Sequence, residues 1–302
     1  MGTEDRSEEV LTSSAFAQWR GRLSDRPKST FNVSKVRRDA EGFAVLSSEP
    51  SGIIEEQVDV DGVRGLWLTP QTALRQDSVV LFLHGGGFVS GSIASHRKLA
   101  GHIAVACSSS VLLIDYRRAP EHPFPAALDD SMTAYLWILK HYPKATTYLC
   151  ADSAGGALAL GLLLDLRNSA VRTARRVALM SPWLDIGRFK DRESDYGEDP
   201  LLDPKVLAQM ADAYVGDGDI NDPRLSPLEA NLEGLPDMFI QVGRDELLRT
   251  DAYALVDRAL PAGTAVTIEL CPMMTHVFQM GVGTFPEADE AIKRIGSWLR
   301  DG

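Results

Sequence analysis

Cysteine is scarce in this chain, and long apolar runs are missing. Of the 302 residues only three are cysteines, namely Cys107, Cys150 and Cys271. An odd number in apolar surroundings predicts buried free thiols and no disulfide framework. No apolar run approaches the roughly 20 residues that a membrane-spanning helix needs. Because the first ten residues are also acidic and polar, unlike a secretory signal, we expect a cytoplasmic protein.

Positively charged residues are also fewer than negatively charged ones. The chain has 31 lysines and arginines against 42 aspartates and glutamates, which gives a formal net charge of −11. Nucleic acids and anionic membrane surfaces are bound by cationic faces, so neither is expected as a partner. The hydrophobic share of 44% is enough for a sizeable core. The composition therefore predicts a globular protein whose acidity serves solubility.

From residue 53 onward the pattern is one of strands and helices. Asp61-Gly62 joins two alternating runs and predicts a hairpin. Apolar runs separated by helix-like segments then indicate a parallel sheet covered on both faces, an α/β fold. Strands are predicted at 53–60, 63–69, 78–83, 110–116, 146–150, 175–182, 237–243 and 265–271, and helices at 95–107, 125–142, 247–260 and 287–300.

Two segments fall outside this alternation. An amphipathic helix is predicted at 7–22, ahead of the first strand, with Phe16 and Trp19 on its apolar side. Residues 185–235 interrupt the core strands and contain a helix that begins at Asp203-Pro204. Insertions of this size usually lie over the carboxyl edge of a sheet, where ligands bind. We interpret residues 185–235 as a lid, with a surface excursion as the alternative.

A serine stands at one strand-to-helix corner. In CADSAGG (150–156) small residues flank Ser153 on both sides, which lets a strand and a helix approach closely and exposes the hydroxyl. Such corners also bind phosphate or simply pack tightly. The glycines of HGGGF (84–88) follow another strand and can turn backbone N–H groups toward a developing negative charge. In a hydrolase the oxyanion donors would be Gly85, Gly86 and Ala154.

An acid and a base follow two later strands. Asp245 and His276 come at the carboxyl ends of the predicted strands 237–243 and 265–271, hence at the same sheet edge as Ser153. A serine hydroxyl needs an imidazole to take its proton and a carboxylate to orient that imidazole. Asp245 could instead cap a helix, leaving Glu246 or Asp251 as the working acid. The order serine, aspartate, histidine favours catalysis.

Several motifs together resemble one family. They are HGGGF (84–88), DYRRAPEHPFPAALDD (115–130), DSAGG (152–156), SPWLD (181–185), DPRLSPL (222–228) and VGRDELL (242–248). Over about residues 55–300 the chain is similar to the hormone-sensitive-lipase-like branch of the α/β-hydrolases. That resemblance implies a mostly parallel eight-stranded sheet with a helical cap. It also implies a cap segment at 1–50 and a catalytic domain at 51–302 that carries a cap insertion at about 185–235.

The same resemblance implies residue roles. Ser153 would be the nucleophile, His276 the base and Asp245 the acid, with Gly85, Gly86 and Ala154 as oxyanion donors. The region of Arg117 and Glu121 would brace the loop beside the site. Two positions depart from the family pattern: Ala151 stands where glycine is usual, and Arg118 where leucine is usual.

The sequence thus predicts a serine hydrolase that cleaves small, short-acyl carboxylic esters through an acyl-enzyme. A lactone hydrolase, a hydrolase-derived ligand receptor and a biosynthetic lyase or cyclase are the alternatives. Neither a cofactor nor a metal ion is expected, and the closing helix at 287–300 is a candidate contact for a homodimer. The residues expected to wall the substrate pocket are Phe88, Trp183, Val277 and Phe278.

Overall fold

A single eight-stranded sheet organises the part of the chain that the computed structural model describes, residues 13–24, 31–71, 77–190 and 199–301. The strand order is β1-β2-β4-β3-β5-β6-β7-β8; β2 pairs antiparallel with both β1 and β4, and all the other pairs are parallel. The strands are β1 (Ile53–Val60), β2 (Val63–Pro70), β3 (Ser78–Leu83), β4 (Ser110–Asp115), β5 (Thr146–Asp152), β6 (Arg176–Met180), β7 (Asp237–Gly243) and β8 (Val266–Cys271). The predicted α/β class and the mostly parallel sheet are confirmed.

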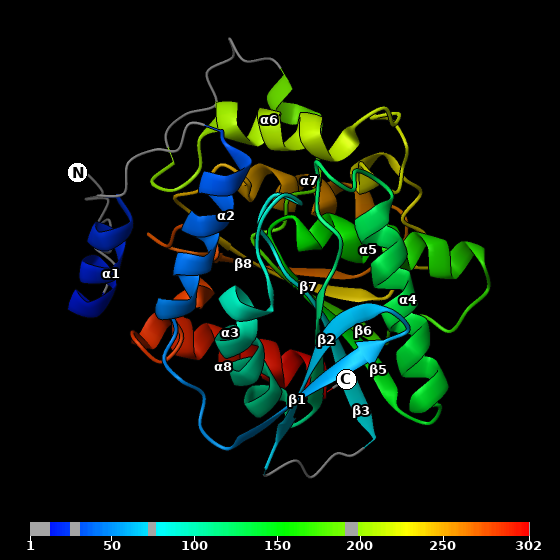
Figure 1. Cartoon of the computed structure of the whole chain (residues 1–302), viewed down its shortest axis with the longest axis horizontal. Helices are drawn as coiled ribbons and strands as arrows, with labels where there is room; N and C mark the ends of the chain where they lie inside the picture. Colours follow the sequence, from blue (N-terminus) through cyan, green and yellow to red (C-terminus); the bar gives the residue numbers. More distant parts are fainter. Residues whose placement is uncertain (1–12, 25–30, 72–76, 191–198, 302) are drawn as a thin grey trace, which may run out of the picture.

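Helices cover both faces of the sheet (Figure 1). The helices are α1 (Ser14–Ser24), α2 (Val33–Glu41), α3 (Ile93–Cys107), α4 (Ala126–His141), α5 (Gly155–Asn168), α6 (Pro204–Val215), α7 (Arg249–Ala259) and α8 (Pro286–Arg300). Helices α3 and α8 pack together on one face, and α4, α5 and α7 cover the other.

Strand β3 shows why the sheet is buried on both sides. All six of its residues are buried, and they alternate between two cores. Val79 and Leu81 contribute to the core under α4 and α5, whereas Val80 and Phe82 contribute to the core under α3 and α8. Because side chains alternate along a strand, only a continuous apolar run can fill both cores.

The predicted hairpin joins β1 to β2. Asp61 and Gly62 have φ values of +50° and +95°. A two-residue turn with positive φ at both positions matches the twist of paired strands, which is why Asp-Gly is favoured there. The pairing of β1 with β2 places Val60 opposite Val63.

The three cysteines are buried and free, as predicted. Within the described ranges, no helix has both the length and the apolarity needed to cross a bilayer. The closing helix α8 is covered along its inner face, where Ala291, Ile292 and Ile295 are buried. Its outer face is charged and exposed, at Glu290, Lys293 and Arg294.

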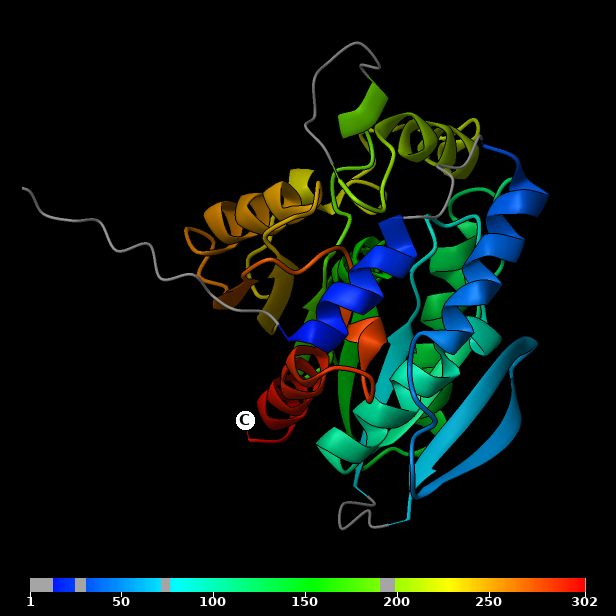
Figure 2. The ribbon, with the colours of Figure 1, turned by 90° about the vertical axis from the view of Figure 1, so that its left-hand side faces the viewer.

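Helices outside the alternating pattern lie over the carboxyl ends of the strands (Figure 2). The helix expected at 7–22 is α1, whose first described residue is Ser14; residues 1–12 lie outside the described part. Phe16 and Trp19 of α1 are buried against Phe285. Helix α6 begins after the Asp203 cap, as predicted, and residues 191–198 of the insertion lie outside the described part.

Helix α2 was not predicted, because residues 24–50 are mostly polar. Its apolar side consists of little more than Val36 and Ala40, both buried. Asn32 caps its start, since the Asn32 side chain accepts a hydrogen bond from the backbone N–H of Lys35.

Candidate active site

Ser153 occupies a strained corner between β5 and α5. Its φ is +50°, a left-handed value that non-glycine residues seldom adopt. The backbone is held there from both sides: Ser153 N–H donates to the Met180 carbonyl at 2.9 Å, and the Trp183 N–H donates to the Ser153 carbonyl at 2.9 Å. A Cβ at Gly155 would collide with the Leu83 carbonyl. The small residues at this corner are therefore a steric requirement of the turn.

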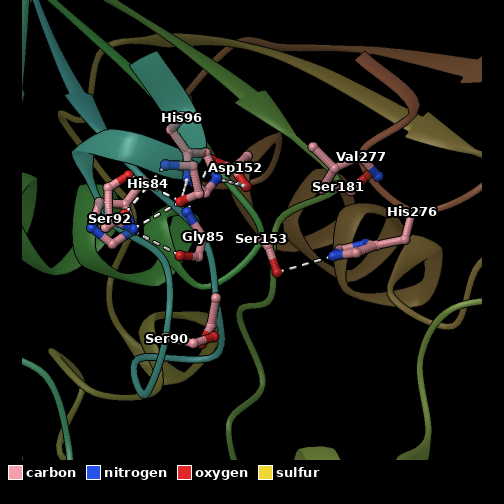
Figure 3. Close-up of polar contacts among 12 residues, drawn as sticks. His84, Gly85, Ser90, Ser92, His96, Asp152, Ser153, Ser181, His276 and Val277 are labelled. Atoms are coloured by element: carbon pink, nitrogen blue, oxygen red, sulfur yellow. Dashed lines mark hydrogen bonds and ion pairs between the residues drawn. The ribbon is translucent and has the colours of Figure 1, made fainter. Parts of the chain in front are cut away.

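His276 meets the serine across the carboxyl edge of the sheet. The distance between His276 Nε2 and Ser153 Oγ is 3.0 Å (Figure 3). The imidazole follows β8, and the next residue, Val277, has a φ of +45° and donates its N–H to Ser181 Oγ at 3.0 Å. The structure thus brings together the predicted nucleophile and base, 123 residues apart in the chain.

The carboxylate that faces the imidazole is Glu246. Glu246 Oε2 lies 3.6 Å from His276 Nδ1, and the Glu246 side chain is fully buried. Ser181 Oγ donates a hydrogen bond to the same oxygen at 2.9 Å. At 3.6 Å the contact with Nδ1 is longer than a hydrogen bond, as catalytic contacts often are without substrate. Ser181 therefore orients both Glu246 and the loop that carries His276.

The expected position of Asp245 beside the imidazole is wrong. Its carboxylate turns outward and accepts a hydrogen bond from Arg20 of α1 at 2.9 Å, with both side chains 34% exposed. Asp251 is also elsewhere, since it accepts hydrogen bonds from the backbone N–H groups of Leu184 and Asp185. Adjacent residues in the turn after β7 point in different directions, and Glu246 is the one that points inward.

Burial and the charge of the partner both shift the pKa values of Glu246 and His276. Burial raises the pKa of Glu246, although His276 and Ser181 favour its ionised form. Burial alone would lower the pKa of His276, but the neighbouring Glu246 carboxylate outweighs it, so the pKa of His276 is raised. The imidazole is thus made a stronger base than an isolated histidine.

Gly85 does not present its N–H to the pocket. That N–H donates to Asp152 Oδ1 at 2.9 Å, and the other Asp152 oxygen lies 3.4 Å from His96 Nε2 (Figure 3). The expectation for Gly85 as an oxyanion donor is therefore wrong. Its bond to Asp152 instead ties the glycine loop to the residue that precedes the nucleophile.

Gly86, an expected donor, and Gly87, which was not predicted, are loop glycines that line the cavity above Ser153. Gly86 and Gly87 have φ values of +115° and +62°, so the chain turns sharply there. No hydrogen bond from the N–H groups of Gly86, Gly87 or Ala154 is found within the described residues. Ala154 is the N-cap residue of α5, and the N–H groups at the start of a helix lack an intrahelical partner. These three N–H groups are the candidate oxyanion donors.

His84 supports the glycine loop from below. It is completely buried, and its Nδ1 lies 2.7 Å from the Gly85 carbonyl oxygen. Its own carbonyl accepts a hydrogen bond from the Tyr116 hydroxyl at 2.8 Å, and its ring stacks on that of Tyr116. Burial lowers the pKa of His84 to about 4, so the ring is a neutral brace at ordinary pH.

A cavity of about 490 Å³ opens above Ser153 and His276. Its walls are mostly apolar and come from α1, α2, α6 and the segment 200–203. Asp199 anchors that segment: its carboxylate accepts hydrogen bonds from the backbone N–H groups of Leu201, Leu202 and Leu247. The apolar lining residues are Trp19, Val36, Ala40, Phe43, Leu46, Pro200, Leu201, Leu202, Val206, Leu207, Met210, Val277 and Met280.

Comparison with known proteins places this geometry in a family. A family model described as the alpha/beta hydrolase fold matches residues 80–280. The chain is 37% identical over 266 residues to an acetyl-hydrolase of Streptomyces hygroscopicus, covering 87% of each chain. It is 34% identical to an esterase of Acinetobacter venetianus, covering 78% of each.

Solved structures agree. One described as an esterase from the bacterial hormone-sensitive lipase family superimposes with a TM-score of 0.87 at 35% identity, covering 97% of this chain and 99% of that one. The chain belongs to the hormone-sensitive-lipase-like α/β-hydrolases.

Three of the four expected pocket residues of this hydrolase are core residues instead. Phe88 is fully buried and stacks on Tyr214 of α6 with ring centroids 3.8 Å apart. Trp183 and Phe278 are also buried, in the two separate cores. Only Val277 lines the cavity. Residues next to a catalytic motif can point away from the site, and the residues that wall the pocket come from helices distant in sequence.

The two departures from the family pattern have different surroundings. The Ala151 methyl is fully buried in the core beside β3 and β6, which accommodate it. The Arg118 guanidinium donates to the Gly91 carbonyl at the end of the glycine loop. No group of three or more histidine, cysteine, aspartate or glutamate side chains suited to a metal ion occurs among the described residues.

Proposed function

We propose that this protein hydrolyses small, short-acyl carboxylic esters through an acyl-enzyme, with Ser153 as nucleophile, His276 as base and Glu246 as acid. The 3.0 Å contact between His276 Nε2 and Ser153 Oγ at the bottom of an apolar cavity carries the proposal. The names of the acetyl-hydrolase, esterase and carboxylesterase relatives support ester hydrolysis as the reaction.

The arrangement accounts for each step of the chemistry. Ser153 Oγ attacks the ester carbonyl while His276 Nε2 takes its proton, and the carbonyl oxygen becomes an oxyanion. The N–H groups of Gly86, Gly87 and Ala154 stabilise that charge. His276 returns the proton to the departing alcohol, and the acyl group stays on Ser153. Water then attacks the acyl-enzyme with His276 as base, which releases the carboxylic acid and restores the serine.

The size of the cavity favours small substrates. Met210 of α6 lies against Gly87, so a side chain in place of that glycine would collide with it. We propose that residues 1–50 and about 185–235 form a cap on a catalytic domain of residues 51–302, and that this cap limits acyl length.

The three buried free thiols support a cytoplasmic location, and a homodimer is the proposed assembly.

Covalent labelling tests the nucleophile. A fluorophosphonate probe is expected to add to the peptide that contains Ser153, as detected by mass spectrometry, and activity should fall in proportion to labelling.

A series of p-nitrophenyl esters of increasing acyl length tests the substrate class. The highest kcat/KM is expected from acetate to butyrate; a solved relative, EstE5, has been soaked with p-nitrophenyl butyrate. Activity confined to emulsified long-chain triglycerides, or no adduct at Ser153, would contradict the proposal.

The pH profile of kcat/KM is a separate prediction. His276 must be neutral to accept the serine proton, and its pKa is raised by Glu246. The acidic limb of the profile is therefore expected above pH 6.5, the ordinary value for histidine. Activity should be lost as the pH falls through that limb. Initial rates with p-nitrophenyl butyrate from pH 5 to 9 would measure it, and a limb below about pH 6 would contradict the assigned pair.

A further inference from the structure

Helix α2 lies between the substrate cavity and a second, polar depression. Val36 and Ala40 line the cavity above Ser153. Arg37 instead borders the depression, a hollow of about 410 Å³ that Arg117, Arg118 and Glu121 also line. One helix therefore forms a wall of the pocket with one face and presents Arg37 from another.

Arg37 joins α2 to two loops at once. Its Nε donates to the Val89 carbonyl at 2.9 Å, and one of its terminal nitrogens donates to the Ala119 carbonyl at 3.0 Å. The guanidinium also forms a bidentate pair with Glu121, at 2.9 and 2.6 Å. This pair lowers the pKa of Glu121 to about 2, so its carboxylate stays ionised at any working pH.

Val89 belongs to the turn that shapes the oxyanion donors. The backbone N–H groups of Val89 and Ser90 both donate to the Gly86 carbonyl, at 3.2 and 2.9 Å, and Ser90 Oγ donates to the same oxygen at 2.8 Å. The orientation of that peptide carbonyl fixes the next N–H, that of Gly87, because the peptide unit is planar. A donor that holds the Val89 carbonyl from outside thus restrains the turn on which the Gly87 N–H depends.

We propose that Arg37 is a positioning residue that couples the cap helix α2 to the oxyanion loop through the Val89 carbonyl. This inference rests on the proposed ester hydrolysis. Arg37 touches no reacting atom. Its guanidinium holds residues 86–90, the 119–121 loop and helix α2 in one arrangement. A shift of about 1 Å in an oxyanion donor is enough to cost up to roughly 10²-fold in rate.

Substitution of Arg37 separates this role from general stability. For Arg37→Gln we expect kcat per active site to fall about 10–100-fold, with a smaller change in KM. Active sites are counted by fluorophosphonate titration, so unfolded protein does not enter the rate. The inhibition constant of butylboronic acid, which places a tetrahedral oxygen at the oxyanion site, should rise in parallel. Arg37→Lys should be intermediate, because the ammonium keeps the charge but lacks the planar fork of donors that a guanidinium presents.

Two control variants test alternative explanations. Glu121→Gln removes the ion pair but leaves both carbonyl contacts, so kcat should stay within about threefold of wild type. Arg167→Gln removes another arginine that bridges two backbone carbonyl groups, those of Asn231 and Glu233, far from the site. It should leave kcat and the boronic acid inhibition constant unchanged. An Arg37→Gln enzyme with both values within twofold of wild type would overturn the proposal.

Hydrogen exchange gives a readout that does not depend on turnover. In Arg37→Gln, amides of the peptide covering residues 86–91 should exchange faster, whereas those of β5 and α8 should not. Unchanged exchange in 86–91 would also overturn the proposal. A wild-type protein that neither hydrolyses esters nor labels at Ser153 would instead refute the proposed function.

Discussion

Substitution of Glu246 by Gln is expected to lower kcat by about 10⁴-fold, the loss typical of a triad acid replaced by its amide. Glutamine has the same shape, so the buried side chain should still fit beside Ser181. A neutral amide no longer stabilises the imidazolium and no longer selects the His276 tautomer whose Nε2 accepts a proton. Steady-state rates on p-nitrophenyl butyrate measure the loss, and thermal unfolding checks that the fold is kept.

The matched control is the neighbouring carboxylate. Asp245→Asn changes the same charge one residue earlier, but Asp245 contacts Arg20 and is 34% exposed. Exposed ion pairs contribute little, so activity should stay within about threefold and stability within about 1 kcal/mol. The acidic limb of the pH profile should shift down in Glu246→Gln and stay in place in Asp245→Asn. A large loss in Asp245→Asn with little loss in Glu246→Gln would return the acid role to Asp245.

Ser153→Ala is expected to have the largest effect, about 10⁶-fold in kcat. The variant keeps the Cβ and the strained backbone of the corner, so the fold and the cavity should be unchanged. What disappears is the atom proposed to form the acyl-enzyme, the oxygen that lies 3.0 Å from His276 Nε2. Single-turnover and steady-state assays with p-nitrophenyl acetate measure the loss.

A comparison of the single variants with the double variant provides the check on that result. Because serine and histidine act as a unit, His276→Ala alone should cost nearly as much as Ser153→Ala, and the double variant little more. Residual hydrolysis above the uncatalysed rate is expected from the oxyanion donors. Retention of substantial activity in Ser153→Ala, with no contaminating enzyme, would rule out the acyl-enzyme mechanism.

The sequence by itself determined the fold class and most elements. The run at 79–83 is apolar at every position, and short runs of this kind are typical of strands buried on both faces. The Asp61-Gly62 turn and the Asp203 cap are local signals, which depend on the backbone preferences of a few residues. Helix α2 was not predicted although Val33, Val36 and Ala40 have helical spacing, because its nine residues lie in a mostly polar stretch.

Only the tertiary structure decided which residues face the site. Asp245 and Glu246 are neighbours in a turn, and the turn's path decides that Glu246 reaches His276 while Asp245 reaches Arg20. Among three consecutive glycines, the bond to Asp152 occupies the Gly85 N–H and leaves Gly86 and Gly87. In both cases, residue types are set by the sequence, but side-chain and N–H directions depend on contacts with residues 30 to 225 positions away.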